Sequence, residues 1–315
     1  MKVKRLQNRI AESRFALPAT ALVALLACLS TGLIGQTRWI QFGLMVVSTY
    51  FMVELNNRNA LLRTYSRMVS CSLLMLDLTV LHLFSTTITA GIVQLCFILH
   101  LLFLFRSYQD KRSMGTIFFA FAMLGIASLW FIQIVFFVPV VWFLMAARLY
   151  SMTWRSFLAS IMGLLAPYWF MGGLLLYQGR TEFISTHIQS IATFDNLFPY
   201  NLPSTMTLVS LAYFALLGVM GSIHFLRNSY LDKIKTRMIY ETIIILLGFT
   251  LCFIILQPQH APLLTPVLIT VVAPLIAHYI TFTRTFVTNL SFIAIIVTAF
   301  LLTALNSWQP LLTFL

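Results

Sequence analysis

The chain has 315 residues, of which 60% are hydrophobic and only 9% are charged, and its formal net charge is +12. Soluble domains carry about 25% charged residues, and a single water-soluble core of this size would not bury so much apolar surface. The composition therefore excludes a soluble protein. Nucleic-acid binding is not indicated either, because the basic residues are dispersed between apolar segments and not gathered on one face.

Apolar segments recur along the whole chain at about 20 residues each, the length of a membrane-crossing helix. They predict an all-α, polytopic transmembrane bundle of about eleven spans built from helical hairpins, in a single integral membrane domain covering residues 1–315. The short pair across 114–147 also fits a partly re-entrant hairpin. The expected spans are 16–35, 39–55, 68–86, 90–105, 114–128, 132–147, 157–177, 204–226, 240–257, 262–282 and 286–305.

The first 15 residues form a basic segment that we expect in the cytoplasm. This segment and the apolar run after it resemble a signal peptide, and "LLAC", which ends at Cys28, resembles a lipoprotein cleavage box. The apolar run continues past Cys28 to Gly35, however, which favours an uncleaved first span.

Four turns between spans repeat a short phrase, in which an arginine is followed by a nearby tyrosine and then by a second arginine. With the N-terminus inside, the cytoplasmic side receives every Lys and Arg except Arg38 and Arg180. This positive-inside bias predicts that the N-terminus is inside and the C-terminus outside. The phrases are "RTYSRM" (63–68), "RSYQDKRSM" (106–114), "RLYSMTWRS" (148–156) and "RNSYLDKIKTRM" (227–238).

These turns have two interpretations. Arginines at helix ends reach lipid phosphates, and tyrosines are frequent at the depth of the aromatic belt, so the turns are expected as topology anchors. The alternative is a lipid-phosphate site on the inner face. The loose spacing of the four phrases favours anchors.

Asp77, in "LLMLDLTVLH", is the exceptional acid because it falls near the middle of its span. A central aspartate costs about 2.5–3.5 kcal/mol on insertion scales. It is therefore either a functional group that relays protons or holds an ion, or a hydrogen-bonded carboxyl that joins two helices. In both cases we expect it to face other helices and not lipid.

The longest outer segment, residues 178–203, is predicted to be an extracytoplasmic loop with a short amphipathic helix on the membrane interface. Ile184, Ile188 and Ile191 recur in it at helical spacing, and Ser204 is expected to cap the next span. In the neighbouring region, Pro258, Pro262, Pro266 and Pro274 are expected to kink helices around a cavity open to the outer side.

Outer ionisable residues supply the catalytic candidates. An arginine binds a phosphate bidentately, and a nearby His or Asp can act as a base. We expect at least one outer arginine to line an outer-leaflet cleft with a histidine, although ordinary contact with water and headgroups is the alternative. The candidates are Arg38, Arg180, His187, His260 and Asp195.

No cofactor or metal is predicted. Cys28, Cys71, Cys96 and Cys252 all fall inside apolar runs, where a free cysteine is usually a small core residue. The sequence lacks paired Cys/His spacing for zinc and the common hydrolase, protease and nucleotide motifs.

The stretch "IASLWFIQIVFFVPVVWFLMAARLYSMTWRSFLASIMGLLAPYWF", together with "VELNNRNALLRTYSRMVSCSLLMLDL", resembles the bacterial inner-membrane family called domain of unknown function 6427. The likeness is an order of features: an Asn-rich inner turn, a Leu-aromatic hairpin, a Trp-Arg inner turn and a Gly-x-x-x-Pro-Tyr span. The hairpin is more distantly similar to capsule and O-antigen polymerases. The resemblance implies a bacterial envelope setting and transfers no catalytic residue.

The leading hypothesis is a multi-pass protein of the bacterial inner (cytoplasmic) membrane. It would handle a lipid-linked or cell-envelope substrate at the outer leaflet, as a transferase or polymerase-like protein. One alternative is a transporter or flippase, with Asp77 and the proline-broken helices in its path. Another is a non-catalytic subunit that scaffolds an envelope complex. The expected partners are membrane lipids, a polyprenyl-linked or other lipid substrate, and membrane proteins. The sequence leaves open whether the protein is an enzyme.

Overall fold

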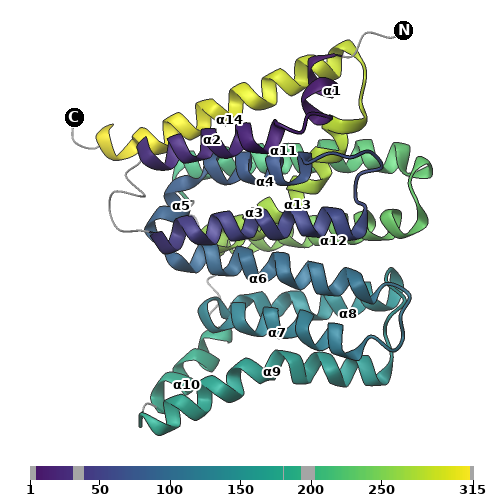
Figure 1. The fold of residues 1–315 in the computed structure, drawn as a ribbon. Helices are drawn as coiled ribbons and strands as arrows, with labels where there is room; N and C mark the ends of the chain where they lie inside the picture. Colours follow the sequence, from purple (N-terminus) through teal and green to yellow (C-terminus); the bar gives the residue numbers. More distant parts are fainter. Residues whose placement is uncertain (1–4, 31–38, 180, 193–202, 313–315) are drawn as a thin grey trace.

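A computed structural model describes residues 5–30, 39–179, 181–192 and 203–312. Throughout these ranges the regular structure is helical and no strand occurs, so the all-α class is confirmed (Figure 1). Short 3₁₀ turns join some of the helices: η1 Phe105–Ser107, η2 Ile132–Phe136, η3 Ser190–Ala192, η4 Ser229–Leu231 and η5 Pro258–His260. The helices are α1 Leu6–Ala11, α2 Ala16–Ser30, α3 Trp39–Asn59, α4 Met68–Thr79, α5 Leu81–Thr86, α6 Ile88–Leu104, α7 Met114–Trp130, α8 Phe137–Ala147, α9 Trp154–Tyr177, α10 Thr181–Gln189, α11 Thr205–Asn228, α12 Ile234–Leu256, α13 Ala261–Phe282 and α14 Phe286–Leu312.

Each apolar segment expected as a span coincides, over its described residues, with one helix or with a helix interrupted by a short break. In the described part of the chain, six helices are long and apolar enough to cross a membrane on their own. This composition is that of a membrane protein. The six are Ile88–Ser107, Trp154–Tyr177, Thr205–Leu231, Ile234–Leu256, Pro258–Phe282 and Phe286–Asn306.

Helix α13 is the centre of the bundle. Every residue from Leu264 to Thr281 is buried, and α4, α6, α11 and α12 pack around it. Pro266 and Pro274 lie inside this helix, which continues through both of them. The expected kink at these two prolines stays a prediction, although neither of them ends the helix. They are buried packing residues of a continuous helix.

Helices α7 and α9 form a closely packed pair on one side of the bundle, and α7 packs on α6, which in turn contacts α3 and α13 (Figure 1). Two glycines allow the close approach. A Cβ on Gly125 would lie 2.5 Å from the backbone oxygen of Leu164, and one on Gly163 would collide with the backbone of Phe118. Small residues at such crossings are how apolar helices pack without a hydrophobic driving force between them.

The predicted span 68–86 is interrupted. Helix α4 ends at Thr79, Val80 adopts φ −125° and ψ 32°, and α5 begins at Leu81. The break frees the carbonyl of Thr79, which accepts a hydrogen bond of 2.6 Å from the Asn306 side chain of α14. The only local sequence signal is the β-branched pair Thr79–Val80, which weakly disfavours helix.

The four basic-aromatic turns lie together at one end of the bundle, at the right in Figure 1. The backbone N–H of Gln109 donates to the carbonyl of Leu149 at 2.8 Å, which joins the second turn to the third. Arg148 in the third turn forms an ion pair of 3.0 Å with Glu241 near the start of α12. The first turn reaches the fourth through Arg63, as described below. We call this the basic end of the bundle.

Helix α1 fastens the N-terminal segment to the basic end. The side-chain amide of Gln7 donates to the carbonyls of Ile280 and Thr283, at 2.7 and 2.9 Å, where α13 ends. Ser66 in the first basic turn donates to the carbonyl of Ala11 at 2.6 Å. Helix α10 and the C-terminal part of α14 lie at the opposite end (Figure 1).

Candidate functional site

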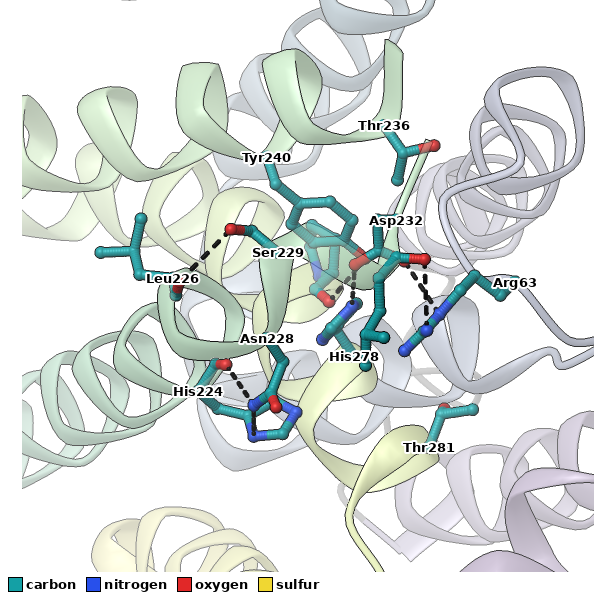
Figure 2. Close-up of polar contacts among 12 residues, drawn as sticks. Arg63, His224, Leu226, Asn228, Ser229, Asp232, Thr236, Tyr240, His278 and Thr281 are labelled. Carbon is teal, nitrogen blue, oxygen red and sulfur yellow. Dashed lines mark hydrogen bonds and ion pairs between the residues drawn. The ribbon is translucent and has the colours of Figure 1, made fainter. Parts of the chain in front are cut away.

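A buried cluster of ionisable side chains occupies the basic end, and Figure 2 shows its contacts. The side chain of Asp232 has no exposed surface, and Arg63 is 31% exposed. One Asp232 carboxylate oxygen lies 3.0 Å from Nε of Arg63, and the other lies 3.1 Å from Nε2 of His278. With His224, whose ring centroid is 5.5 Å from that of His278, these residues form what we call the Asp232 cluster.

Three separate elements bring the cluster together. Asp232 follows η4 in the fourth basic turn, where its backbone N–H donates to the carbonyl of Ser229 at 3.0 Å. Arg63 comes from the first turn, and its guanidinium lies 4.2 Å from the centroid of the Phe282 ring and donates to the carbonyl of Leu231 at 3.4 Å. His278 comes from α13, so the cluster ties two turns to the central helix.

Aromatic rings enclose His278. The rings of Phe225, Tyr240 and Phe282 have centroids 5.2, 5.1 and 4.7 Å from that of His278. The Tyr240 hydroxyl donates to the carbonyl of Pro274 at 3.3 Å, which fixes its ring. This apolar wall excludes water and strengthens the electrostatic interaction between the carboxylate and its two partners.

The arrangement can hold and transfer a proton. A carboxylate beside Nε2 favours the tautomer in which this nitrogen carries the hydrogen, which leaves Nδ1 of His278 as the acceptor. Among the described residues this Nδ1 has no hydrogen-bond partner, and neither has Nε2 of His224. An acid, an imidazole and a free acceptor nitrogen in this order are the components of general-base catalysis and of proton relays.

The cluster adjoins an open groove on the side of the bundle, which we call the α11 groove. Its volume is about 690 Å³. Along α11 the lining is apolar first and becomes polar in the last turn, while Tyr279 closes it from α13. The lining residues are Leu216, Val219, Met220, Ile223, His224, Arg227, Asn228 and Tyr279.

Side chains in the last turn of α11 present hydrogen-bond donors to the groove. Arg227 is exposed, and His224 and Asn228 are half-buried. The Asn228 amide donates to the carbonyl of His224 at 2.8 Å and lies 3.3 Å from its Nδ1. His224 therefore stands between the groove and the buried His278.

Gly221 allows α11 to approach α13 closely enough for His224 to lie beside His278. A Cβ on Gly221 would lie 2.7 Å from the backbone carbon of Leu275, so α11 and α13 are in direct backbone contact one turn before His224. On the other side of α11, Phe225 stacks on Tyr240 with a centroid distance of 4.5 Å. These two contacts fix the rotation of α11 that turns His224 toward His278.

Asp77 is completely buried in α4, and the side-chain amide of Gln94 in α6 donates to its Oδ1 at 2.6 Å. The prediction that this carboxyl faces other helices is confirmed, and its functional role stays a prediction.

The outer candidates are only partly described. His187 lies on α10, and its Nε2 is 3.1 Å from the carbonyl of Ser128. His260, in η5, lies beside the rings of Phe131 and Phe253, at 5.7 and 6.2 Å between centroids. Arg38, Arg180 and Asp195 lie outside the described residues. The expected cleft that joins an outer arginine to a histidine therefore stays a prediction.

The predicted amphipathic helix of the outer segment is α10, with Ser204 as the N-cap of α11, where its hydroxyl accepts from the N–H of Thr207 at 3.3 Å. A cavity of about 530 Å³ lies between α10, α9 and the α7–η2 corner. His187, Ile188 and Ile191 line it from the α10 side.

Within the described ranges, no group of three or more His, Cys, Asp and Glu side chains is placed to hold a metal ion.

Comparisons with protein-family models, with curated proteins and with solved structures found no match.

Sequence reasoning alone misses the Asp232 cluster. In the sequence, Asp232 is one of several acids in turns between spans, and His278 is a lone histidine in an apolar segment. The available signal is an acid inside a strongly basic turn and a histidine inside an apolar run. Nothing in the periodicity of either segment indicates that the two meet.

Proposed function

We propose that this chain is a multi-pass protein of the bacterial inner membrane that binds a lipid-linked substrate with an anionic headgroup in the α11 groove. The observation that carries the proposal is the polarity of this groove, which is apolar from Leu216 to Ile223 and polar from His224 to Asn228. This order matches an amphiphilic ligand, with its chains at membrane depth and its headgroup at the basic end.

In this proposal the bundle crosses the membrane about eleven times, with the N-terminus inside and the C-terminus outside, as the basic residues indicate. The basic end is then the cytoplasmic end. All four basic-aromatic turns lie at this end, which supports the orientation. The cytoplasmic leaflet contains anionic lipids, and these attract basic residues. The headgroup would lie in the inner leaflet.

The charge around the groove favours an anion. Arg227 offers a planar guanidinium, which pairs bidentately with phosphate, and the half-buried His224 lines the groove beside it. Asp232, the acid behind the groove, is neutralised by Arg63 and covered by protein, so it does not repel the ligand. His224 and His278, whose ring centroids lie 5.5 Å apart, are the titratable side chains between the headgroup position and the buried carboxylate.

Native mass spectrometry of the purified protein tests the proposal. Retention of a polyprenyl phosphate, an anionic phospholipid and a zwitterionic phospholipid is compared for the wild type, Arg227→Gln and Arg112→Gln. Arg112 is the matched control, because it is an exposed arginine of another turn at the same end. We expect Arg227→Gln to weaken retention of the anionic lipids about tenfold, the effect of losing one charge-assisted hydrogen bond, and Arg112→Gln to leave it unchanged.

Preference for the polyprenyl phosphate over the anionic phospholipid would assign a lipid-linked substrate. Equal retention of both would assign an ordinary membrane lipid. Equal retention of all three lipids by all three proteins contradicts the proposal.

Handling at the outer leaflet, the site expected from the sequence, is a second candidate, and the cavity beside α10 favours it. His187 and Tyr168 bring polar atoms to this otherwise apolar cavity, and the Tyr168 hydroxyl donates to the Ser128 hydroxyl at 2.7 Å. Under this candidate, His187→Ala impairs envelope function at normal protein levels, whereas Ser185→Ala, an exposed position on the same helix, does not. Wild-type behaviour of His187→Ala removes the candidate.

A further inference from the structure

The pair formed by Asp77 and Gln94 lies apart from the α11 groove and is unexplained by lipid binding. Both side chains have no exposed surface, and the Gln94 amide donates to Asp77 Oδ1 at 2.6 Å. Asp77 is nine residues beyond the start of α4, a rise of about 13 Å, which is close to the middle of a hydrocarbon core about 30 Å thick.

Each residue of the pair retains one unsatisfied oxygen. Asp77 Oδ2 and Gln94 Oε1 are both buried, and neither has a hydrogen-bond partner among the described residues. If Asp77 were ionised, the two acceptors would remain without a donor in a medium of low dielectric constant, which is costly. A single proton on Oδ2, donated to Oε1, satisfies both at once and closes a cyclic acid–amide pair.

We propose that Asp77 and Gln94 form a proton-binding site in the middle of the bundle, and that loss of its proton weakens the contact between α4 and α6. The balance is simple: the Asp77 carboxylate takes up one proton and becomes a neutral acid, and no bond other than O–H forms or breaks. The ligand of the site is the proton alone.

The surroundings of the pair suit this role. Among the described residues Asp77 forms no ion pair, and Gln94 is its hydrogen-bond partner. Titratable or charged side chains other than Asp77 occur on α4 itself and on α2, α3, α5, α6 and α13 around the pair, whereas α7 and α14 carry none. They are Cys28, Tyr50, Glu54, Arg58, Cys71, His82, Cys96, His100, His278 and Tyr279.

Another polar group lies at matching depth. A Cβ on Gly91 of α6 would lie 3.1 Å from the Leu44 side chain of α3, and both helices run toward the basic end. One turn further along α3, Ser48 is therefore level with Gln94. Ser48 is completely buried, and its hydroxyl has no partner in the described chain.

The pair also lies beside the break in its own helix. Helix α4 ends two residues after Asp77, at Thr79, whose freed carbonyl is held by Asn306. A change in the protonation of Asp77 therefore acts on a segment whose backbone hydrogen bonds are already interrupted. Interrupted helices with a buried acid at the break are where transporters place ion sites, so the site supports proton-linked movement of this helix.

Infrared difference spectroscopy of the full chain in detergent tests the proton. We expect a protonated-carboxyl C=O band at neutral pH that is lost in alkaline buffer and is absent from Asp77→Asn. The asparagine side chain of this variant can form the same cyclic pair with Gln94, so the variant should fold. Asp110→Asn, which alters an exposed acid in a turn, should keep the band. In Gln94→Leu the band should remain and shift in frequency, because its amide donor is gone.

A second measurement tests whether loss of the proton weakens the contact between α4 and α6. We expect the melting temperature of the wild type to fall from neutral to alkaline pH relative to that of Asp77→Asn, because ionisation leaves two buried acceptors, Oδ2 and Oε1, without a donor. Absence of the Asp77 band at neutral pH would overturn the site. Parallel melting curves for the two proteins at all pH values would overturn the link between the proton and the helix contact.

Discussion

Asp232 Oδ2 and His278 Nε2 lie 3.1 Å apart although 46 residues separate them along the chain. The contact joins the α11–α12 turn to the central helix, and Arg63 adds the first basic turn to the same carboxylate. Three segments at the basic end therefore share one buried charge. The α11 groove opens beside this charge, so we expect the cluster to support both stability and the groove.

The first prediction concerns the stability of the Asp232 cluster. Asp232→Asn should lower the free energy of unfolding by about 3 kcal/mol, because it leaves Arg63 without its partner beside a buried site. Thermal or denaturant unfolding in detergent measures the effect. Glu54→Gln is the control, since its pair with Arg58 is a solvent-facing i,i+4 contact whose loss should cost about 0.3–0.5 kcal/mol. Equal stability of the two variants would contradict the structural importance of the cluster.

The second prediction concerns the contact between α11 and α13. Gly221→Ala should lower the melting temperature, because its Cβ would lie 2.7 Å from the backbone of Leu275 and would push the two helices apart. The control is Gly248→Ala, where nothing lies within 4 Å and alanine is the better helix former by about 1 kcal/mol. A melting temperature for Gly221→Ala at or above that of Gly248→Ala would show that α11 does not require the close approach.

The third prediction concerns orientation. Cysteine introduced at Thr64, in the first basic turn, should be shielded from an impermeant thiol reagent in intact cells, whereas cysteine at Ser185 on α10 should react. Both positions are exposed, so access depends on the side of the membrane. The background needs Cys252→Ser, because Cys252 is exposed while Cys28, Cys71 and Cys96 are buried. Labelling at Thr64 without labelling at Ser185 would reverse the proposed topology.

The lengths and positions of the apolar segments predicted where most of the helices lie. The apolar segments became helices at the expected places, because in such a composition a run of about 20 apolar residues has few other ways to satisfy its backbone. The repeated Arg-Tyr turns predicted that all four turns lie at the same end of the bundle. This prediction was possible because the basic residues of each turn can be read from that turn alone. Amphipathic spacing likewise predicted α10.

What failed depends on contacts between distant segments. The break at Val80 has no proline or glycine, and it is compensated by Asn306 more than 200 residues later, a partner that no local pattern reveals. The prolines of α13 do not reveal from the sequence that the helix continues through both of them and is buried along its length. The pairing of Asp232 with His278 is likewise a contact between segments that are distant in the sequence.

Site-specific photo-crosslinking along α11 tests the central claim most directly. A photoreactive amino acid is placed at Ile223, which lines the groove and is 53% exposed, or at Leu226, which lies outside the groove on the same helix and is 55% exposed. Adducts formed in native membranes are identified by mass spectrometry. We predict that adducts at Ile223 are enriched in a lipid with an anionic phosphate headgroup, that those at Leu226 follow the bulk lipid composition, and that Arg227→Gln abolishes the difference. The same bulk composition at both positions would contradict a lipid-binding groove.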